Sequence, residues 1–565
     1  MIKYLLILFF VFSSLAQLQF SQNGSDDEKL RSIVSEKGQA EVVIPDPGNR
    51  EIDRITRIVS ISSVKDKEVR LFLSPLTVEW FISEGFDYRI IERTASKGII
   101  SSSGLSQAME WESYPSYTQY DSIMRYFAAT YPLLCILDTI GTSINGRLIL
   151  CLKISDNSGV AEPEPEVFYS STIHGNETAG FILMLRLADY LLENYTSDLK
   201  VKDLVDNLEI WINPLANPDG TYNSGNFIIS PVRNNANGYD LNRNFPDPEI
   251  PDAIRQKETL EMMSFLADHR FVLSANFHSG EEVVNYPWDR WSTQHADYEW
   301  FYSISRAWAD TVHLYSEPGY MDYLDNGVTQ GYDWYPVYGG RQDYVTYTLS
   351  GREITVELDE DFITSASELD DIWNYNYRSL LGFLQNALYG IHGQISDAFT
   401  GDPVSAKIFV ERHDKDSSHV YSDTLTGNFT RLLAPGSYDL TFTADGYWDL
   451  VIKDIAVLKA EPTKLFVKIK PMLNPADTTN PAQPFFYPNP AGTYINAVLP
   501  ESIRGAVNIR IYNIAGMKVS DFDTEASDRY PVRLDVSRLP AGSYFAVFTG
   551  IPANLSYTGR FIISR

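Results

Sequence analysis

Between residues 111 and 390, short apolar runs of β type alternate with longer stretches of helical periodicity. Residues 166–173 form a β-rich run, and residues 179–192 carry apolar side chains at helical spacing. The elements expected before them are a helix at 117–131 and strands at 133–140 and 147–154. Strands that alternate with helices predict a parallel or mixed sheet with helices on both faces. We therefore expect an α/β domain over residues 111–390.

A smaller segment of mixed pattern precedes this domain, at residues 26–95. The elements expected in it are strands at 55–62, 68–73 and 86–91 and a helix at 75–84. A polar stretch rich in Ser and Gly separates the segment from the large domain. The pattern is compatible with either a propeptide-like unit or a small packing module.

Beyond Gly390 the pattern changes to short alternating strands with turn residues between them. It predicts a β-sandwich at 391–472. A linker rich in Pro, Thr and Asn follows at 473–484, and a second β-module occupies 485–565. The length of 565 residues accommodates several such domains, each large enough to bury a core.

The chain opens with the pattern of a signal peptide. A short basic start, Met1–Lys3, precedes an apolar stretch from Tyr4 to Leu15, and the small residues of Ser14–Ala16 suit cleavage. We expect a signal peptide at 1–22. No later apolar run is long enough to cross a bilayer, so we expect the mature protein to be exported and soluble.

The net charge of the chain narrows the class of partner that it can bind. Lys and Arg number 46 against 74 Asp and Glu, a net charge of -28. This argues against nucleic acid as a partner, and it either favours cationic substrates or only keeps the protein soluble.

Cys135 and Cys151 lie in consecutive predicted strands, where a cross-strand disulfide and two buried thiols are both consistent with the pattern.

Three residues near the ends of predicted strands are candidate metal ligands. His174 and Glu177 follow the strand at 166–173, and a helical start there would direct both side chains to one side. His278 ends a second β-rich run, 271–278. Alone, a His-x-x-Glu pair is more often a surface feature. Open α/β sheets place their sites at the carboxyl ends of strands, and a catalytic zinc site takes three protein ligands, so the three together favour a site.

A polar stretch, 233–247, lies between these candidates along the chain. It is dense in Asn and Arg and is flanked by Gly and Pro. Because Arg forms bidentate pairs with carboxylates, the stretch is a candidate for holding a substrate carboxylate. A hydrogen-bonded surface loop is the alternative.

Together these motifs resemble the zinc carboxypeptidase family, and within it the regulatory branch that includes carboxypeptidases N, E, M and D. The matching stretches are His174-Gly-Asn-Glu177, Asn217-Pro-Asp-Gly220, Asp240-Leu-Asn-Arg-Asn-Phe-Pro-Asp247, Ser274-Ala-Asn-Phe-His278, Val284–Asp289, Trp334-Tyr335, Gly339–Asp343 and Glu353–Leu358. They cover most of residues 112–390. The resemblance implies a mixed eight-stranded sheet with helices on both faces, followed by two small all-β sandwich domains.

The resemblance also implies roles for individual residues. One Zn²⁺ per chain would be held by His174, Glu177 and His278, and Asp240 would orient His174. The residues implied in catalysis are Glu357 as general base and acid, Arg233 as the group that polarises the scissile carbonyl, and Tyr335 as the residue that closes over the substrate's last residue.

Substrate recognition is implied for a second group of residues. Asn242 and Arg243 would bind the free C-terminal carboxylate, while Asp289 would form the floor of the side-chain pocket, with Gln342 on its wall. A buried carboxylate there would select Lys or Arg. Arg341 departs from the family pattern, which commonly has Met. Turned inward, its guanidinium would neutralise Asp289, and turned outward it would be a surface residue.

The two C-terminal modules resemble accessory domains. Residues 391–472 are similar to the transthyretin-like sandwich of the regulatory branch, and 485–565 are similar to the C-terminal sorting domain of type IX secretion. The stretches that carry these likenesses include Gly393–Asp397, Ala434–Tyr438, Tyr487-Pro-Asn-Pro490 and Gly559–Ile562. The second likeness implies export through the periplasm and outer membrane of a Gram-negative bacterium; a generic adhesive module is the alternative.

The function expected from the resemblance is a secreted zinc metallocarboxypeptidase that removes C-terminal basic residues from peptides or proteins. One alternative is a zinc peptidase that cleaves cell-wall peptides. The other is a catalytically inactive, peptide-binding surface protein. The presence of Glu357 and of all three candidate ligands favours an active enzyme over the inactive alternative.

Overall fold

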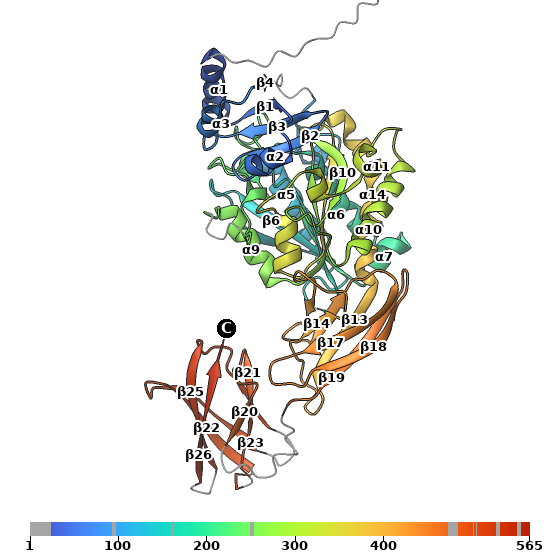
Figure 1. The fold of residues 1–565 in the computed structure, drawn as a ribbon. Helices are drawn as coiled ribbons and strands as arrows, with labels where there is room; N and C mark the ends of the chain where they lie inside the picture. Colours follow the sequence, from blue (N-terminus) through green and yellow to red (C-terminus); the bar gives the residue numbers. More distant parts are fainter. Residues whose placement is uncertain are drawn as a thin grey trace, which may run out of the picture.

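The structure is a computed structural model that describes residues 24–92, 98–160, 162–248, 254–472, 484–500, 502–503, 505–526, 531–550 and 555–564. The signal peptide predicted at 1–22 lies outside these residues, as does nearly all of the linker predicted at 473–484. Four bodies follow each other along the chain (Figure 1): a small α/β unit, a large α/β domain and two β-sandwiches. No helix of the described part is long and apolar enough to span a membrane.

The large domain is built on a mixed eight-stranded sheet, as predicted, in the order β11-β10-β12-β9-β7-β8-β6-β5. Its strands are β5 (Cys135–Thr142), β6 (Leu148–Ile154), β7 (Glu166–Ser171), β8 (Glu209–Asn213), β9 (Phe271–His278), β10 (Glu281–Tyr286), β11 (Val328–Gln330) and β12 (Glu353–Asp359). The four central strands β12, β9, β7 and β8 are parallel. Their carboxyl ends therefore meet at one edge of the sheet.

Helices cover both faces of this sheet, because its central strands bury alternate side chains on opposite sides. In β7, Val167 and Tyr169 pack into the core that includes residues of α5, α6, α10 and α14, whereas Phe168 packs with residues of α9 on the other face. The helices are α5 (Tyr117–Thr130), α6 (Ala179–Asn194), α7 (Leu199–Val205), α9 (Lys257–Asp268), α10 (Tyr298–His313) and α14 (Leu369–Gln385). The predicted fold class is confirmed.

The N-terminal unit is a four-stranded antiparallel sheet, β2-β3-β1-β4, with three helices. Its elements are α1 (Gly24–Lys37), β1 (Ala40–Pro45), α2 (Asn49–Thr56), β2 (Ser60–Lys65), β3 (Glu68–Leu73), α3 (Val78–Glu84) and β4 (Arg89–Ile91). The strand predicted at 55–62 is wrong in its first half. Ile52 and Ile55 lie three apart and are both buried by α2, which is helical rather than strand spacing.

Both C-terminal modules are β-sandwiches, as predicted. The first packs sheet β16-β13-β19 on sheet β15-β14-β17-β18, and the second packs β20-β21-β24 on β23-β22-β25-β26. The strands of the first are β13 (Gly390–Asp397), β14 (Lys407–Val410), β15 (Val420–Tyr421), β16 (Asn428–Arg431), β17 (Gly436–Thr443), β18 (Leu450–Val457) and β19 (Pro462–Ile469). Those of the second are β20 (Phe485–Tyr487), β21 (Tyr494–Val498), β22 (Gly505–Asn513), β23 (Lys518–Ala526), β24 (Val532–Asp535), β25 (Gly542–Gly550) and β26 (Ser556–Ile563).

The two cysteines are free and buried. In the β5–β6 pair, Cys135 lies opposite Ile154 and Cys151 lies opposite Asp138. The two thiols are therefore three residues out of register, and the alternative of two buried thiols holds.

Candidate metal centre and active site

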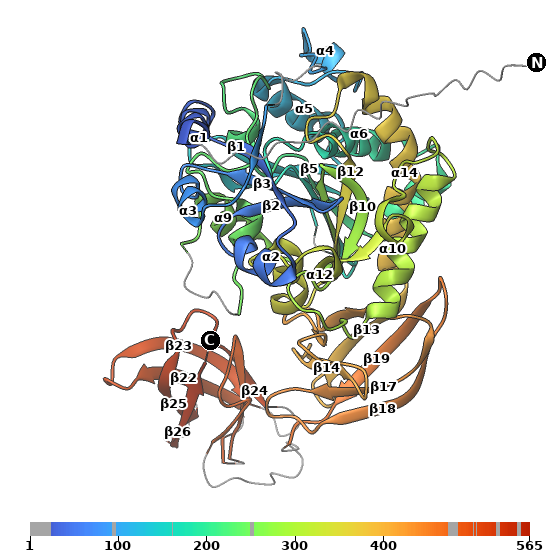
Figure 2. The same cartoon turned by 45° about the horizontal axis from the view of Figure 1, so that its top comes forward.

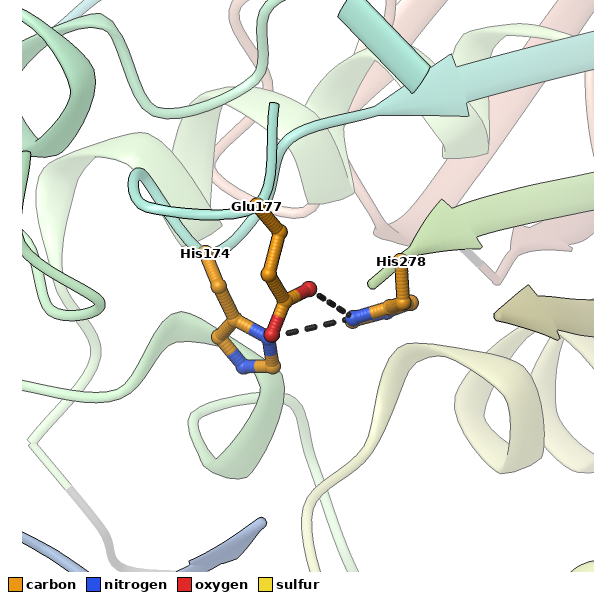
Figure 3. Close-up of side chains that lie close together, drawn as sticks. All are labelled: His174, Glu177 and His278. Carbon is orange, nitrogen blue, oxygen red and sulfur yellow. Dashed lines mark hydrogen bonds and ion pairs between the residues drawn. The ribbon is translucent and has the colours of Figure 1, made fainter. Parts of the chain in front are cut away.

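The three candidate ligands come together at the carboxyl ends of neighbouring parallel strands. His278 is the last residue of β9, and His174 and Glu177 lie in the turn between β7 and α6 (Figure 3). The helical start expected for this pair is wrong, since α6 begins only at Ala179. The turn nevertheless directs both side chains toward His278.

Distances within this cluster are short. Glu177 bridges the two imidazoles, with Oε1 2.8 Å from Nδ1 of His174 and Oε2 2.6 Å from Nδ1 of His278. The two Nδ1 atoms are 3.1 Å apart. Each of the three side chains is about 2% exposed. Three ligand atoms thus point at one small volume.

Asp240 fixes the tautomer of His174. Its Oδ1 lies 3.0 Å from Nε2 of His174, and a carboxylate at this position only accepts, so Nε2 carries the proton and Nδ1 keeps its lone pair. Although burial opposes ionisation, the nearby His174 and Arg233 hold the pKa of Asp240 well below its usual range. Arg233 joins the cluster by donating to Oδ2 of Asp240 at 3.1 Å and to Oε1 of Glu177 at 2.9 Å.

The donor set fits a zinc ion. Two nitrogens that bind one tetrahedral zinc at the usual bond length of about 2.0–2.1 Å lie about 3.3 Å from each other, close to the 3.1 Å between the two Nδ1 atoms. Burial lowers the pKa of His278 to about 4, which keeps its imidazole neutral, as metal binding requires. Two imidazole nitrogens and a carboxylate oxygen are also the donors that zinc prefers.

One pocket gathers most of the residues singled out in the sequence. The predicted residues that line it are His174, Glu177, Arg233, Asn242, Arg243, His278, Asp289, Tyr335 and Glu357. The two remaining predicted site residues contact residues of this lining: Asp240 contacts His174, and Gln342 contacts Asp289. Glu357 lies opposite His278 in the β12–β9 pair. Burial, and then the charge of Glu177, raises the pKa of Glu357 well above its usual value.

Asn242 and Arg243 belong to a short turn capped by Asp240, whose Oδ1 accepts the backbone N–H of Asn242 at 2.8 Å. The same carboxylate therefore positions both the metal-site imidazole and this turn. Arg243 donates to the backbone carbonyl of Ile61 at 3.3 Å. Tyr335 packs against the hydrophobic core of the N-terminal unit, and burial raises the pKa of its hydroxyl to about 12.

Asp289 is a buried residue of the pocket lining, and its side chain accepts hydrogen bonds from two amides. Its Oδ1 accepts from Nε2 of Gln342 at 2.8 Å and from Nδ2 of Asn285 at 3.1 Å. A Cβ on Gly331 would lie 1.8 Å from this oxygen, so only glycine fits there. Burial raises the pKa of Asp289 to about 7.

Arg341 takes neither of the two orientations considered from the sequence. Its guanidinium is fully buried and forms a bidentate ion pair with Glu353, at 2.9 Å from Nε and 3.1 Å from Nη2. The surface alternative is therefore wrong. The guanidinium also lies over the ring of Phe168, 5.3 Å from its centroid, and so points toward the sheet.

The N-terminal unit closes over the pocket, which the sequence did not indicate. Ser62 of β2 lines the pocket, and Ser60 donates to Oδ2 of Asp240 at 2.6 Å. Figures 1 and 2 show the sheet β1–β4 lying across the large domain, at the end away from the first sandwich. Other pocket residues not singled out before include Asn285, Thr355 and Phe362. Asn285 and Thr355 could have been found from the sequence, because they lie in the motif stretches Val284–Asp289 and Glu353–Leu358.

Comparisons with known proteins agree with this geometry. A family model described as zinc carboxypeptidase matches residues 120–379, and one described as a secretion system C-terminal sorting domain matches 485–564. Carboxypeptidase D of Homo sapiens is 36% identical over 60% of this chain, which spans 26% of that protein. Carboxypeptidase SOL1 of Arabidopsis thaliana is 34% identical over 59% of this chain and 68% of its own length. The carboxypeptidase N catalytic chain of Mus musculus is 32% identical over 62% of this chain and 85% of its own length.

Proposed function

Because this chain belongs to the zinc carboxypeptidase family, we propose that it is a zinc metallocarboxypeptidase that releases basic residues from the C-termini of peptides. The observation that carries the hydrolase part is the convergence of His174, Glu177 and His278 beside Glu357. The chain spans only about a quarter of the first relatives it matches, so its activity is inferred from its own site.

The proposed roles follow from chemistry and placement. Zinc held by the three ligands would act as a Lewis acid toward the scissile carbonyl and would activate a water molecule. Glu357 accepts a proton from the attacking water and passes it to the leaving amine, a task that suits a buried carboxyl with a raised pKa. Arg233 donates to the carbonyl oxygen as charge develops on it. Asn242 and Arg243 bind the substrate's terminal carboxylate, and Tyr335 closes over its last residue.

Support for a basic preference comes from the surroundings of Asp289. Its side-chain contacts in the described part of the chain are with neutral amides, Asn285 and Gln342. A buried carboxylate whose hydrogen bonds come from amides and not from a cation is prepared to pair with an incoming ammonium or guanidinium group, whereas an apolar side chain would leave it without such a partner. Arg341 does not compete, since Glu353 binds it.

Hydrolysis of matched dipeptides that end in Arg, Lys, Phe or Glu tests this proposal. We expect the highest kcat/KM with Arg and Lys, loss of turnover after a chelator removes the metal, and recovery with zinc. Preferred release of Phe would overturn the role of Asp289 and leave the metal site standing. Metal-free protein without turnover on any substrate would favour the inactive, peptide-binding alternative. Selective cleavage of cell-wall peptides would favour the alternative of a zinc peptidase that acts on the cell wall.

We propose that the N-terminal unit is propeptide-like. Its strand β2 lies beside the residues assigned to the substrate carboxylate, and the carbonyl of Ile61 occupies a donor of Arg243. Further bonds tie β2 to the rim: Ser63 donates to Glu281 at 2.7 Å, and Lys65 lies 3.3 Å from the same carboxylate. A peptide C-terminus that binds Nη2 of Arg243 would compete with that carbonyl.

The C-terminal sorting domain indicates a secreted or cell-surface protein. We propose the type IX machinery as the partner that recognises residues 485–565, after a signal peptide at 1–22 has directed the chain to the periplasm of a Gram-negative bacterium. The domain at 391–472 is assigned a supporting role as a transthyretin-like module, and 473–484 is assigned as the linker between the two sandwiches.

A further inference from the structure

The short helix α13 (Arg341–Asp343) lies beside the side-chain pocket, and each of its three residues has a distinct task. Gln342 donates to Asp289, and Asp343 accepts the backbone N–H groups of Asp289 and Arg290 at 3.1 and 3.0 Å. Arg341 precedes them and donates its own N–H to Asn242. The one cationic residue of α13 is therefore adjacent in sequence to the residue that touches Asp289.

Such a cation would compete with a basic substrate. A guanidinium that turned toward Asp289 would form the ion pair that the pocket offers to Lys or Arg, and its charge would repel the incoming side chain. The direction of the Arg341 side chain therefore decides whether Asp289 is available.

Glu353 sets that direction. It is the first residue of β12, and it shares one face of the strand with Thr355 and Glu357, which line the pocket, because side chains two apart point the same way. Both of its oxygens bind Arg341, and Ser274 of the neighbouring strand donates to Oε2 at 2.7 Å. Arg341 and Glu353 are each fully buried, so water screens neither charge.

From this arrangement we propose that Glu353 is a specificity-determining residue, which acts by binding Arg341 and so withholding its positive charge from Asp289. The pair also explains how the chain combines Arg at 341 with an acidic pocket floor. Glu353 does not touch the substrate, so it is a positioning residue. The inference rests on the proposed preference for basic residues.

The test is a double-mutant cycle on the full chain loaded with zinc, read as the ratio of kcat/KM for a dipeptide ending in Arg to that for one ending in Phe. In Glu353→Gln the guanidinium loses its counter-charge, and we expect the ratio to fall by about ten-fold or more. In Glu353→Gln combined with Arg341→Met the cation is gone, and the ratio should return to the wild-type value. Arg341→Met alone should keep the ratio at or above that value.

A purely structural role for the pair gives a different pattern. If the pair only anchors α13, then the double variant and Arg341→Met lose the preference as well, and the proposal is overturned. Should Glu353→Gln not fold, Arg341→Met alone still separates the two outcomes. Glu209→Gln is the matched control, since it breaks the buried pair Lys153–Glu209 at 2.8 Å elsewhere in the same sheet, and it should leave the ratio unchanged.

Asp289→Asn separates this inference from the proposed function. If that variant keeps the preference for Arg, the basic pocket itself is wrong. If it abolishes the preference while Glu353→Gln does not change it, only the role of Glu353 is wrong.

Discussion

Ser60 donates a 2.6 Å hydrogen bond to Oδ2 of Asp240, whose other oxygen lies 3.0 Å from Nε2 of His174. The serine belongs to the N-terminal sheet, and the other two belong to the metal site. The N-terminal unit therefore contacts not only the rim of the pocket but also Asp240, the residue that orients the candidate ligand His174. Removal of the N-terminal unit would break this contact at the catalytic centre.

The first prediction concerns that removal. With a protease site inserted between Glu92 and Gly98, cleavage followed by separation of the N-terminal fragment is expected to raise kcat/KM for small substrates by about ten-fold or more, because Arg243 loses a competing acceptor. Size-exclusion chromatography measures the separation, and dipeptide hydrolysis measures the gain. A chain with a scrambled protease site is the control. Unchanged or lower activity after separation would mean that the unit is a packing module.

Glu357→Gln is expected to lower kcat by about 10²–10⁴-fold, the usual contribution of a general base, while the protein still binds zinc. The amide has the same shape but cannot accept the proton of the attacking water. Metal content is measured by atomic emission, and turnover with an Arg-terminated dipeptide. Glu360→Gln, at an exposed position three residues along the same segment, is the control and should be near wild type. Wild-type turnover in Glu357→Gln would mean that Glu357 is not the general base.

Some residues of this site could be predicted from the sequence, and others could not. His278 could be placed because an apolar run ends at a polar residue, and the same logic located the turn that carries His174. Ser60 could not be placed, because it is 180 residues from Asp240, and only the docking of two separate sheets brings them together. Nor could the direction of Arg341, since neither orientation considered included Glu353 as a buried counter-charge. The strand expected at 55–62 failed for a local reason, because its apolar residues are divided between the end of α2 (Ile55), the turn that follows (Ile58 and Val59) and the start of β2 (Ile61).

Substrate preference should depend on pH through Asp289, whose pKa burial raises to about 7. Below this pH the carboxyl is neutral and holds a cation weakly. Above it the carboxylate pairs with Lys or Arg. The ratio of kcat/KM for Arg over Phe is therefore expected to rise between about pH 6 and 8, with its midpoint near pH 7, and then to level off. Charged groups that act on Asp289 are Arg243, Glu353 and Asp343.

Taking this ratio cancels the titration of the metal ligands, which affects both substrates alike. In Asp289→Asn the ratio should be low and independent of pH. A wild-type ratio that is flat from pH 5 to 8, or one that falls as the pH rises, would contradict the assignment.

The last prediction concerns the contact between the large domain and the first sandwich, which centres on Asp297. Arg431 of β16 binds both oxygens of this carboxylate at 2.8 Å, and Arg352 donates to it at 2.7 Å. Arg431 also donates to Asp414 at 2.6 Å. All of these acids and Arg431 are fully buried. Arg431→Met would leave two buried carboxylates short of a counter-charge, so a loss of about 3–5 kcal/mol is expected.

Arg412 is a matched control for Arg431, because it lies in the same sandwich and also pairs with a carboxylate but is exposed to solvent. It lies 3.0 Å from Asp439, and its side chain is 84% exposed. A surface pair of this kind contributes at most about 1 kcal/mol, so Arg412→Met should hardly change the unfolding midpoint, whereas Arg431→Met should lower it clearly. Hydrogen exchange should also rise across 428–434 in the Arg431 variant only. Equal effects of the two substitutions would mean that apolar packing, and not the buried charges, holds the sandwich against the large domain.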